Sequence, residues 1–341
     1  QQFNVWNLQQ QAPDTSIYES AFALLMNAHY RTTPNDFRYL LDAPNVELMT
    51  LQQGEHLIGA VLVVTEGEIT EDLSEQIWQG RRRPRGNLFP QSLIAHAGFK
   101  QAGKYKFARI VRIAVHPELQ GTGIGSELLQ QVEHYVQSAG YDFICTSFGY
   151  WQSLYQFWRK NQFEPVRLGI KAEASTAEHS IFMCRLLSNQ QEQSELFKQL
   201  QQRFKYTLMA EKKLSLKSAL EFISNNVTDS QNGLSGCLEQ EYLAQFETQD
   251  QQDLISFANH HRSLFTCLLA MLRFSQHYPD KLKLLDEKHQ TLLNELLNGS
   301  KQQKTNSITK IQQGLVKQFG FSGEKELVKT LREIWQVLIT T

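Results

Sequence analysis

The sequence has few cysteines and no long apolar segment. Its 341 residues include four cysteines, and no two of them have the spacing of a metal-ligating pair. They are Cys145, Cys184, Cys237 and Cys267. We therefore expect reduced thiols in a cytoplasmic protein, with neither a disulfide framework nor a metal site. No apolar run of about 18 residues and no signal peptide occur, so we expect no membrane span.

The sequence also lacks a net charge. Lys and Arg number 34 and Asp and Glu 35, giving −1, and such a balance argues against a nucleic-acid-binding protein. Yet between Glu75 and Glu118 there are nine basic residues and no acidic one. Because a solvated surface usually mixes both signs, the segment is a candidate track for RNA phosphates, unless some of its residues pair with carboxylates elsewhere. We assign RNA contacts to Arg81, Arg82, Arg83, Arg85, Lys104, Lys106 and Arg112.

Composition changes along the chain and predicts three parts. The 41% hydrophobic and 11% aromatic content is enough for packed cores, and the length suggests more than one domain. Residues 1–13 are rich in Gln, which predicts a linker. Residues 14–188 mix helix and strand patterns, which predicts an α/β domain. In residues 189–341 the apolar spacing is helical throughout, which predicts an all-helical domain or tail.

The expected elements follow from apolar periodicity and from Gly, Pro and capping signals. Helices are predicted over residues 14–28, 34–41, 70–79, 90–97, 125–139 and 152–161. Strands are predicted over residues 46–52, 57–65, 109–115, 143–148, 164–169 and 180–187. In the last part, helices are predicted over residues 190–206, 214–225, 239–246, 253–277, 280–298, 307–319 and 324–339.

A strand followed by a glycine-rich turn and a helix carries the clearest chemical signal. The strand ends in Ala114-Val115-His116-Pro117, and Gln120-Gly121-Thr122-Gly123-Ile124-Gly125-Ser126 opens the helix. Backbone N–H groups at a helix N-terminus bind anions, and side chains at the three glycines would obstruct a pyrophosphate there. A Rossmann turn is the rival, but Asp142 precedes its strand instead of ending it. A Walker A loop needs a lysine that Gly125-Ser126 lacks.

The pattern Gln-x-x-Gly-x-Gly after Ala-Val-His-Pro resembles motif A of the GNAT acetyltransferases. The resemblance implies a GNAT fold with acetyl-CoA as cofactor, and a strand N–H that stabilises the thioester oxyanion. It implies that the pantetheine arm contacts Ile113, Ala114 and Val115. It implies that the pyrophosphate contacts Gln120, Gly121, Thr122, Gly123, Ile124, Gly125 and Ser126. Residues 154–163 resemble the later motif B helix, where we add Ser153 and Lys160 as cofactor contacts.

One position departs from the GNAT pattern. Many GNAT enzymes have a Tyr five residues before a closing Gly-Phe, and this Tyr protonates the departing thiolate. Here that position holds Trp158, and Gln162-Phe163 replaces the Gly-Phe. An indole cannot act as that acid, so the proton comes from another group or the thiolate leaves unprotonated.

Segments outside motif A narrow the resemblance. They are residues 28–36, 42–44, 83–88, 112–117, 147–150 and 177–180. Together they resemble the acetyltransferase half of the tRNA(Met) cytidine acetyltransferases, which make N4-acetylcytidine. The resemblance is specific over residues 14–188 and weak over the helical remainder, where it implies an RNA-binding tail. It implies transfer of acetyl from acetyl-CoA to cytidine N4 in tRNA, with the wobble cytidine of elongator tRNA(Met) as the expected target.

The same family uses ATP through an N-terminal helicase-like module. This sequence contains no Walker A motif and begins with Gln1. Either the ATPase module lies outside this polypeptide, or the protein lacks it. The resemblance therefore implies ATP as a cofactor of the family, with its site outside this chain, and a helicase-like module as a further partner.

Acetylation of cytosine N4 releases a proton, and a positioned base contributes roughly 10²–10⁴-fold to such a step. His29 is our candidate base because the pKa of imidazole suits the role. Tyr30 beside it is the candidate to orient the base or to protonate the thiolate. A locally satisfied histidine at a helix end is the alternative interpretation, and Glu178 with His179 is the reserve pair.

Other residues are candidates for RNA contact. Tyr150, Trp151 and Tyr155 could stack an unpaired base, although aromatic residues on a helix more often belong to the core. Lys301, Lys304, Lys310 and Lys317 could extend the footprint. Two other functions stay open. One is a GNAT enzyme acting on a small amine or a protein lysine, and the other is a non-catalytic RNA-binding remnant.

Overall fold

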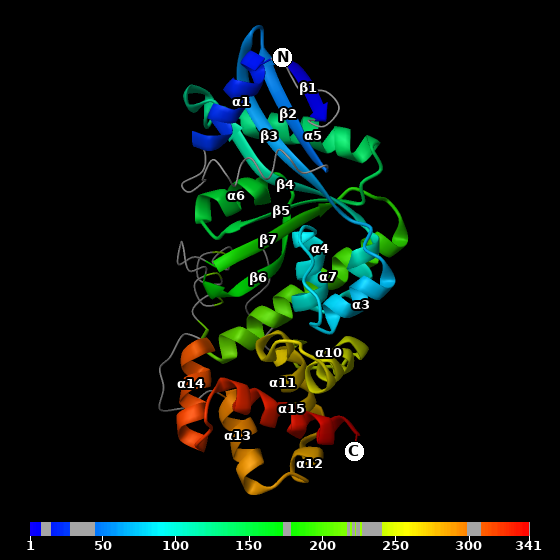
Figure 1. Cartoon of the computed structure of the whole chain (residues 1–341), viewed down its shortest axis with the longest axis vertical. Coiled ribbons are helices and arrows are strands. Elements are labelled where there is room, and N and C mark those ends of the chain that lie inside the picture. Colours follow the sequence, from blue (N-terminus) through cyan, green and yellow to red (C-terminus); the bar gives the residue numbers. More distant parts are fainter. Residues whose placement is uncertain are drawn as a thin grey trace.

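The computed structural model describes residues 1–7, 15–27, 45–172, 179–216, 219, 222, 226, 241–298 and 308–340. Figure 1 shows an elongated molecule in which a sheet with its helices occupies one end and a group of helices occupies the other. The N-terminus lies at the sheet end and the C-terminus at the helical end. None of the helices in the described ranges is long and apolar enough to cross a membrane.

A seven-stranded sheet with the order β1-β2-β3-β4-β5-β7-β6 forms the first part. Its strands are β1 (Gln2–Asn7), β2 (Val46–Gln53), β3 (His56–Gly67), β4 (Lys106–Val115), β5 (Phe143–Gly149), β6 (Glu164–Ala172) and β7 (His179–Leu186). The β4–β5 pair is parallel, and the other described pairs are antiparallel. This mixed sheet with its helices is the α/β architecture predicted from the sequence of residues 14–188.

The interpretation of residues 1–13 as a linker is wrong for Gln2–Asn7. This segment is β1 and pairs with β2 from Gln2–Gln52 to Asn7–Glu47. Phe3 and Val5 alternate with polar residues and pack against the core. The Gln-rich composition concealed this short strand, in which Phe3 and Val5 contact the cluster on one side of the sheet and Trp6 contacts the cluster on the other side.

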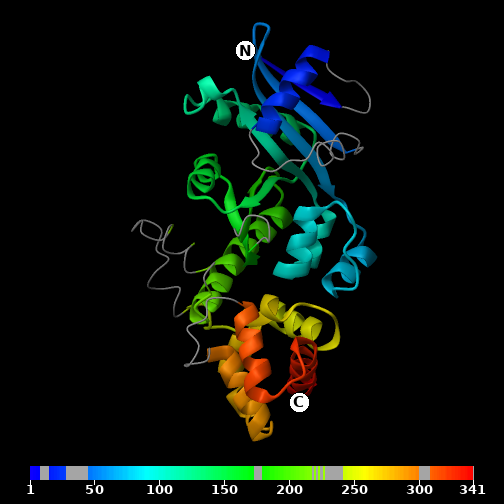
Figure 2. The same ribbon diagram turned by 60° about the vertical axis from the view of Figure 1, so that its left-hand side comes forward.

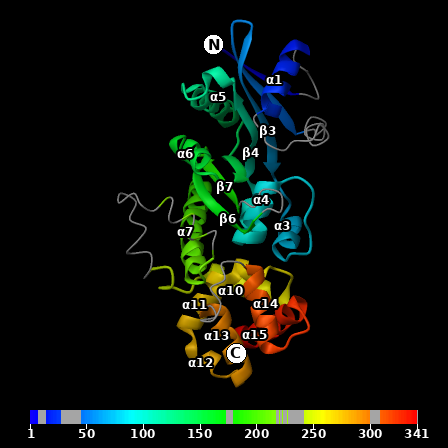
Figure 3. The same cartoon turned by 90° about the vertical axis from the view of Figure 1, so that its left-hand side faces the viewer.

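Helices cover both faces of the sheet, as Figure 3 shows. On one face lie α5 (Ile124–Ser138) and α6 (Gln152–Lys160). The other face carries α1 (Thr15–Asn27), α3 (Glu71–Trp78), α4 (Leu88–Ser92), a π-helix (Leu93–Ala97) and a 3-10 helix (Lys100–Lys104). A further 3-10 turn, Pro117–Leu119, follows β4. Successive side chains of β4 point to opposite faces of the sheet. Ile110 therefore packs with α5, whereas Phe107 packs with α4.

The helical part confirms the predicted absence of strands in the described residues after 188. Its helices are α7 (Gln191–Lys213), α10 (Thr248–Asn259), α11 (Leu268–His277), α12 (Pro279–Leu282), α13 (Glu287–Asn298), α14 (Ile308–Phe319) and α15 (Glu324–Thr340). The single helix predicted over residues 253–277 is wrong. Helix α10 ends at Asn259, and a 3-10 helix, Leu264–Cys267, precedes α11. The break occurs where the His261 N–H donates to the carbonyl of Gln79 in the sheet domain, 2.9 Å away.

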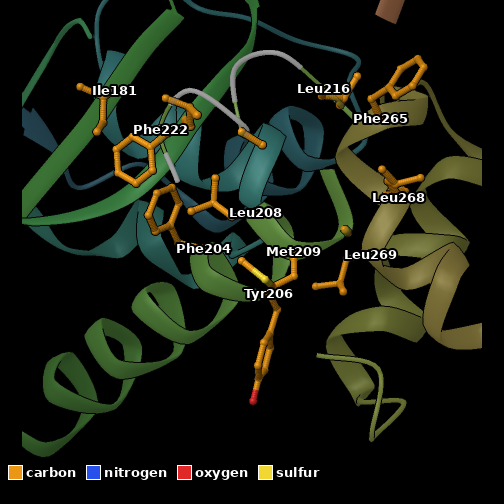
Figure 4. Close-up of a cluster of buried hydrophobic side chains, with 14 of the residues drawn as sticks. Ile181, Phe204, Tyr206, Leu208, Met209, Leu216, Phe222, Phe265, Leu268 and Leu269 are labelled. Carbon is orange, nitrogen blue, oxygen red and sulfur yellow. The ribbon is translucent and has the colours of Figure 1, made fainter. Parts of the chain in front are cut away.

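Helix α7 joins the two parts, and Figure 2 shows it running from beneath the sheet toward the other helices. Leu196 and Leu200, in its first half, belong to the buried cluster on the α4 face of the sheet. Phe204 and Met209, further along, belong to the large cluster that includes the helical part, and Figure 4 shows Met209 beside Leu269. Burying each such side chain stabilises the fold by roughly 1.5–3 kcal/mol, so α7 couples the two parts mechanically.

Candidate functional site

Strands β4 and β5 separate beyond their first residues. Their parallel register runs from Phe107–Phe143 to Ile110–Thr146, whereas β4 continues to Val115 and β5 to Gly149. The β3–β4 register also shifts, because Leu62 pairs with Arg112 and Val63 with Ile110, which leaves Val111 as a bulge. The edge of β4 that faces β5 over residues 111–115 is therefore free of the ladder, and its backbone groups can pair with an extended amide-containing ligand.

The glycine-rich turn follows directly and has the conformation that an anion site requires. Gly121 and Gly123 have φ of +77° and +98°, in the left-handed region that favours glycine. Gly123 caps α5, so the first N–H groups of this helix point out of the turn. A Cβ at either glycine meets nothing within 4 Å. The space is open for a phosphate group, which the exposed N–H groups and the helix dipole favour.

Two side chains hold this turn against the end of β4. The Gln120 amide donates to the carbonyl of Val115 over 3.2 Å, and the Thr122 hydroxyl donates to the carbonyl of Leu119 over 2.6 Å. Gly125 differs from the other two glycines, since a Cβ there would lie 3.4 Å from Cε2 of Phe157 in α6. Gly125 therefore allows α5 to pack closely on α6.

The two predicted contacts on α6 lie at opposite ends of that helix. Ser153 is in its first turn and Lys160 is its last residue, and both side chains are exposed. Seven residues of helix separate them by about 10 Å, so they would contact different parts of a ligand. Trp158 between them is 2% exposed and stacks edge-on against Phe163 at 4.8 Å. Trp158 is thus a core residue.

The predicted catalytic pair, His29 and Tyr30, lies outside the described residues, as does Glu178. His179, of the reserve pair, begins β7. Its Nδ1 lies 2.7 Å from the carbonyl oxygen of Gly169. This contact joins β7 to β6 and orients the imidazole ring.

The basic segment does not form one continuous track. Lys100 pairs with Glu75 at 2.6 Å, Lys104 with Glu192 at 2.7 Å, and Arg109 with Glu66 at 2.6 Å. For Lys104 this pair lies at the surface, where it is worth little, so Lys104 stays accessible to RNA. Lys106 lies 4.1 Å above the ring of Tyr141.

The prediction of a surface contact is wrong for Arg112, which is 8% exposed. It lies on β4 opposite Leu62, so its side chain points into the packed α1 face of the sheet. The exposed cluster that remains is the loop after α3. It consists of Arg81, Arg82, Arg83 and Arg85.

The three candidate stacking residues differ in their exposure and contacts. Tyr155 is 7% exposed and packs edge-on against Phe222 at 5.4 Å, so it belongs to the core and the stacking prediction fails for it. The Tyr150 hydroxyl accepts from the Asn226 amide over 2.8 Å. Trp151, at the start of α6, is 64% exposed and remains available for a base.

The tail lysines are only partly described. Lys310 and Lys317 are exposed on α14, whereas Lys301 and Lys304 lie outside the described residues. In the described part of the chain, no three or more His, Cys, Asp and Glu side chains are grouped so that they could hold a metal ion.

The family GNAT acetyltransferase 2 matches residues 20–142 and 134–188. The chain belongs to this acetyltransferase family. The GNAT domain thus covers the splayed strands and the glycine-rich turn, and the resemblance noted from motif A is confirmed.

Several curated relatives carry one name, tRNA(Met) cytidine acetyltransferase TmcA. The protein of Nitrosococcus halophilus is 40% identical over 176 residues, which are 52% of this chain and 24% of the relative. That of Photorhabdus asymbiotica is 32% identical over 80% of this chain and 37% of the relative. That of Haemophilus influenzae is 35% identical over 75% of this chain and 36% of the relative. The chain thus spans about a quarter to under two fifths of these relatives' length, and the longer matches extend into its helical part.

Solved structures show more distant likeness. The ribosomal-protein-S18-alanine N-acetyltransferase of Escherichia coli is 13% identical, with a TM-score of 0.37, over 56% of this chain and 97% of that one. A Bacillus subtilis acetyltransferase in complex with CoA is 16% identical, with a TM-score of 0.34, over 55% and 98%.

A buried carboxyl group beneath the GNAT sheet gives a prediction about pH. Glu211 of α7 is 2% exposed. Burial raises the pKa of Glu211 to about 8, although the Arg167 guanidinium opposes the shift. The pKa of Glu211 is higher in the folded state than in the unfolded state. At pH values between these two pKa values, the folded state therefore binds more protons than the unfolded state. The free energy of unfolding falls as pH rises through this range.

Glu211→Gln, which mimics the protonated acid, is therefore expected to flatten the loss of stability between about pH 5 and pH 8. Urea unfolding at several pH values measures this. Glu195→Gln, an exposed position on the same helix, is the control and should keep the wild-type slope. Equal slopes in the Glu211 variant and the wild type would contradict the prediction.

Proposed function

We propose that this chain is the acetyltransferase and tail portion of a tRNA cytidine acetyltransferase. It transfers acetyl from acetyl-CoA to N4 of cytidine in tRNA, with the wobble cytidine of elongator tRNA(Met) as the target. The observation that carries the proposal is the separation of β4 from β5 beside the Gly121–Gly123 turn at the start of α5. The name shared by the curated relatives supports the RNA substrate. A tRNA substrate also favours a cytoplasmic location.

The residues present fit acetyl-CoA. The free edge of β4 at Ile113–Val115 can pair with the amides of the pantetheine arm, and the N–H groups at the start of α5 can hold the pyrophosphate. Acetyl-CoA supplies an activated acyl group as its thioester. An N–H of β4 near the Val111 bulge is placed to stabilise the charge that develops on the thioester oxygen.

The transfer forms the N4–acetyl bond, breaks the acyl–sulfur bond and releases one proton from N4. We propose His29 as the base that takes this proton, with Tyr30 to orient it or to return a proton to the sulfur. The buried indole of Trp158 takes no part in proton transfer.

His29→Ala is expected to keep acetyl-CoA affinity and to lower turnover by roughly 10²–10⁴-fold, the usual contribution of a positioned base. Calorimetry measures the affinity and single-turnover kinetics measure the rate. His56→Ala, at an exposed position at the start of β3, is the matched control and should act as wild type. Unchanged turnover in His29→Ala would remove this residue from the mechanism.

The proposed substrate class is tested by competition. Radiolabelled acetyl-CoA is incubated with the chain and a mixture of tRNA, spermidine and a lysine-rich protein, with and without ATP and a helicase-like module. We expect label in the tRNA fraction. Label in spermidine or protein alone favours the small-amine or lysine function. Failure to bind acetyl-CoA in calorimetry favours a non-catalytic remnant.

A further inference from the structure

A large basic cavity lies between the GNAT domain and the helical part. Its volume is about 830 Å³. On the sheet side it is lined by the loop after α3, by the π-helix and by β4, β6 and β7. On the other side it is lined by residues 261–266, α14 and α15. Figure 3 shows α4 and β6 facing α14 across this level of the molecule.

The lining contains five arginines and one carboxylate, that of Glu324. They are Arg83, Arg109, Arg167, Arg262 and Arg332. Arg109 pairs with Glu66, and Arg262 pairs with Asp253; neither of these two carboxylates lines the cavity. Those two cations are already compensated, so the charge of the cavity depends on the other three.

Arg83, Arg167 and Arg332 have no carboxylate partner within 4 Å among the described residues. Arg83 Nη1 donates to the carbonyls of Ile77 and Arg82 over 2.8 Å. Arg332 Nη1 donates to the carbonyl of His260 and its Nη2 to the carbonyl of Arg262, the latter over 3.1 Å, and its Nε is buried without a described acceptor. Arg167 lies 4.8 Å above the ring of Phe182. Three guanidinium groups thus keep donors available for an anion.

The surrounding groups leave this charge unneutralised. Burial, together with the positive charges of Arg167, Arg83 and Arg262, lowers the pKa of His96 to about 3, so this imidazole is neutral. Burial lowers the pKa of Arg167 to about 10, which keeps it charged near neutral pH. The raised pKa of Glu211 leaves the acid behind Arg167 largely protonated below about pH 8.

The cavity adjoins the place where β4 and β5 separate. Arg109 lies on β4 two residues before the Val111 bulge. Ser180 and Phe182, also in the lining, pair with Gly149 and Ser147 of β5, beyond the last β4–β5 pair. A nucleotide chain that places a base at the strand separation therefore has its adjacent backbone within reach of the cavity.

We propose that this cavity binds a backbone phosphate adjacent to the target cytidine through Arg83, Arg167 and Arg332. The inference rests on the proposed function. Guanidinium groups bind phosphate oxygens in a bidentate manner, which fixes orientation as well as charge. A polynucleotide is favoured over a free nucleotide because Arg81, Arg82 and Arg85 continue the positive charge from Arg83 along the exposed loop.

The test compares Arg83→Gln and Arg332→Gln with Lys283→Gln. Lys283 is an exposed lysine that directly follows α12, and Figure 1 shows α12 at the end of the helical part away from the sheet. Fluorescence anisotropy with transcribed tRNA over a salt series gives the affinity and its salt dependence. Each cavity variant is expected to bind tRNA about tenfold more weakly and to lower the salt slope by about 0.7–0.9. Lys283→Gln should keep both values, and all variants should keep acetyl-CoA affinity.

The outcomes are distinct. If wild type binds and acetylates tRNA while both cavity variants keep its affinity and salt slope, the cavity proposal is overturned and the proposed function stands. If the variants lose affinity for ATP or AMP while tRNA binding is unchanged, the cavity binds a free nucleotide and the RNA assignment is overturned. If wild type neither binds nor acetylates tRNA, the proposed function itself fails.

Discussion

Replacing Gly123 with valine is expected to weaken acetyl-CoA binding severely, whereas the same change at Gly140 leaves binding intact. Both glycines have positive φ, +98° and +75°, and a Cβ at either meets nothing within 4 Å. They flank the two ends of α5, so the backbone strain of a β-branched residue, roughly 1–3 kcal/mol, is similar at both. Only at Gly123 does the new side chain occupy the space in front of the helix N-terminus.

We expect the affinity of Gly123→Val for acetyl-CoA to fall by at least about 100-fold, because the valine side chain occupies the space that a phosphate group needs in front of the exposed N–H groups. Isothermal titration measures the affinity, and thermal unfolding verifies that both variants are folded. Similar acetyl-CoA affinities in the Gly123 and Gly140 variants would place the pyrophosphate elsewhere.

Replacing Asp253 with asparagine is expected to destabilise the protein by about 3–5 kcal/mol, the usual cost of an uncompensated buried charge. Asp253 accepts from Arg203 of α7 over 2.6 Å and from Arg262 over 2.5 Å, and all three side chains are buried. Asp250 beside it accepts from Arg203 and, over 2.8 Å, from Arg273. Removing the charge of Asp253 leaves Arg262 without its carboxylate partner, and Arg203 keeps only Asp250, which it shares with Arg273.

This network also joins the helical part to the GNAT domain. Gly98 has φ of +89°, and a Cβ there would lie 2.5 Å from Oδ1 of Asp253 and 2.8 Å from Nη2 of Arg262. Urea unfolding measures the loss in Asp253→Asn, and Asp280→Asn, an exposed pair with Lys283, is the control with little expected effect. A free energy of unfolding within about 0.5 kcal/mol of wild type would show that the network contributes no net stability.

The pH dependence of this network follows from Asp250. Although burial opposes the shift, Arg203 and Arg273 hold the pKa of Asp250 below its usual value. Its folded pKa is depressed, so its contribution is present above the unfolded pKa and is lost as pH falls through the folded pKa. The network therefore stabilises the protein at neutral pH and weakens only in strong acid.

The glycine-rich turn was predictable from sequence because its function depends on local geometry. Gly121, Gly123 and the helix that begins at Ile124 are consecutive, and their order alone specifies the left-handed turn and the exposed N–H groups. The α/β order of the GNAT domain was predictable for a similar reason, since each helix and strand shows its own periodicity.

The cavity and the fate of the basic segment were not predictable, because they depend on partners far along the chain. Arg109 and Lys104 pair with Glu66 and Glu192, which only the folded sheet and α7 bring near. Arg167 and Arg332 lie far apart in the sequence, and nothing around either residue in the sequence connects it to the other. The position of Arg167 directly between two apolar residues, Val166 and Leu168, is a sequence feature that could have indicated a buried binding role.

The most direct measurement is nucleoside mass spectrometry of tRNA after incubation with the chain and acetyl-CoA carrying a heavy-isotope acetyl group, with and without ATP and a helicase-like module. If the chain transfers acetyl to cytidine, we expect labelled N4-acetylcytidine with the wild type and none with Gly123→Val. Wild-type protein that binds both acetyl-CoA and tRNA but yields no labelled acetylcytidine under any of these conditions would contradict it.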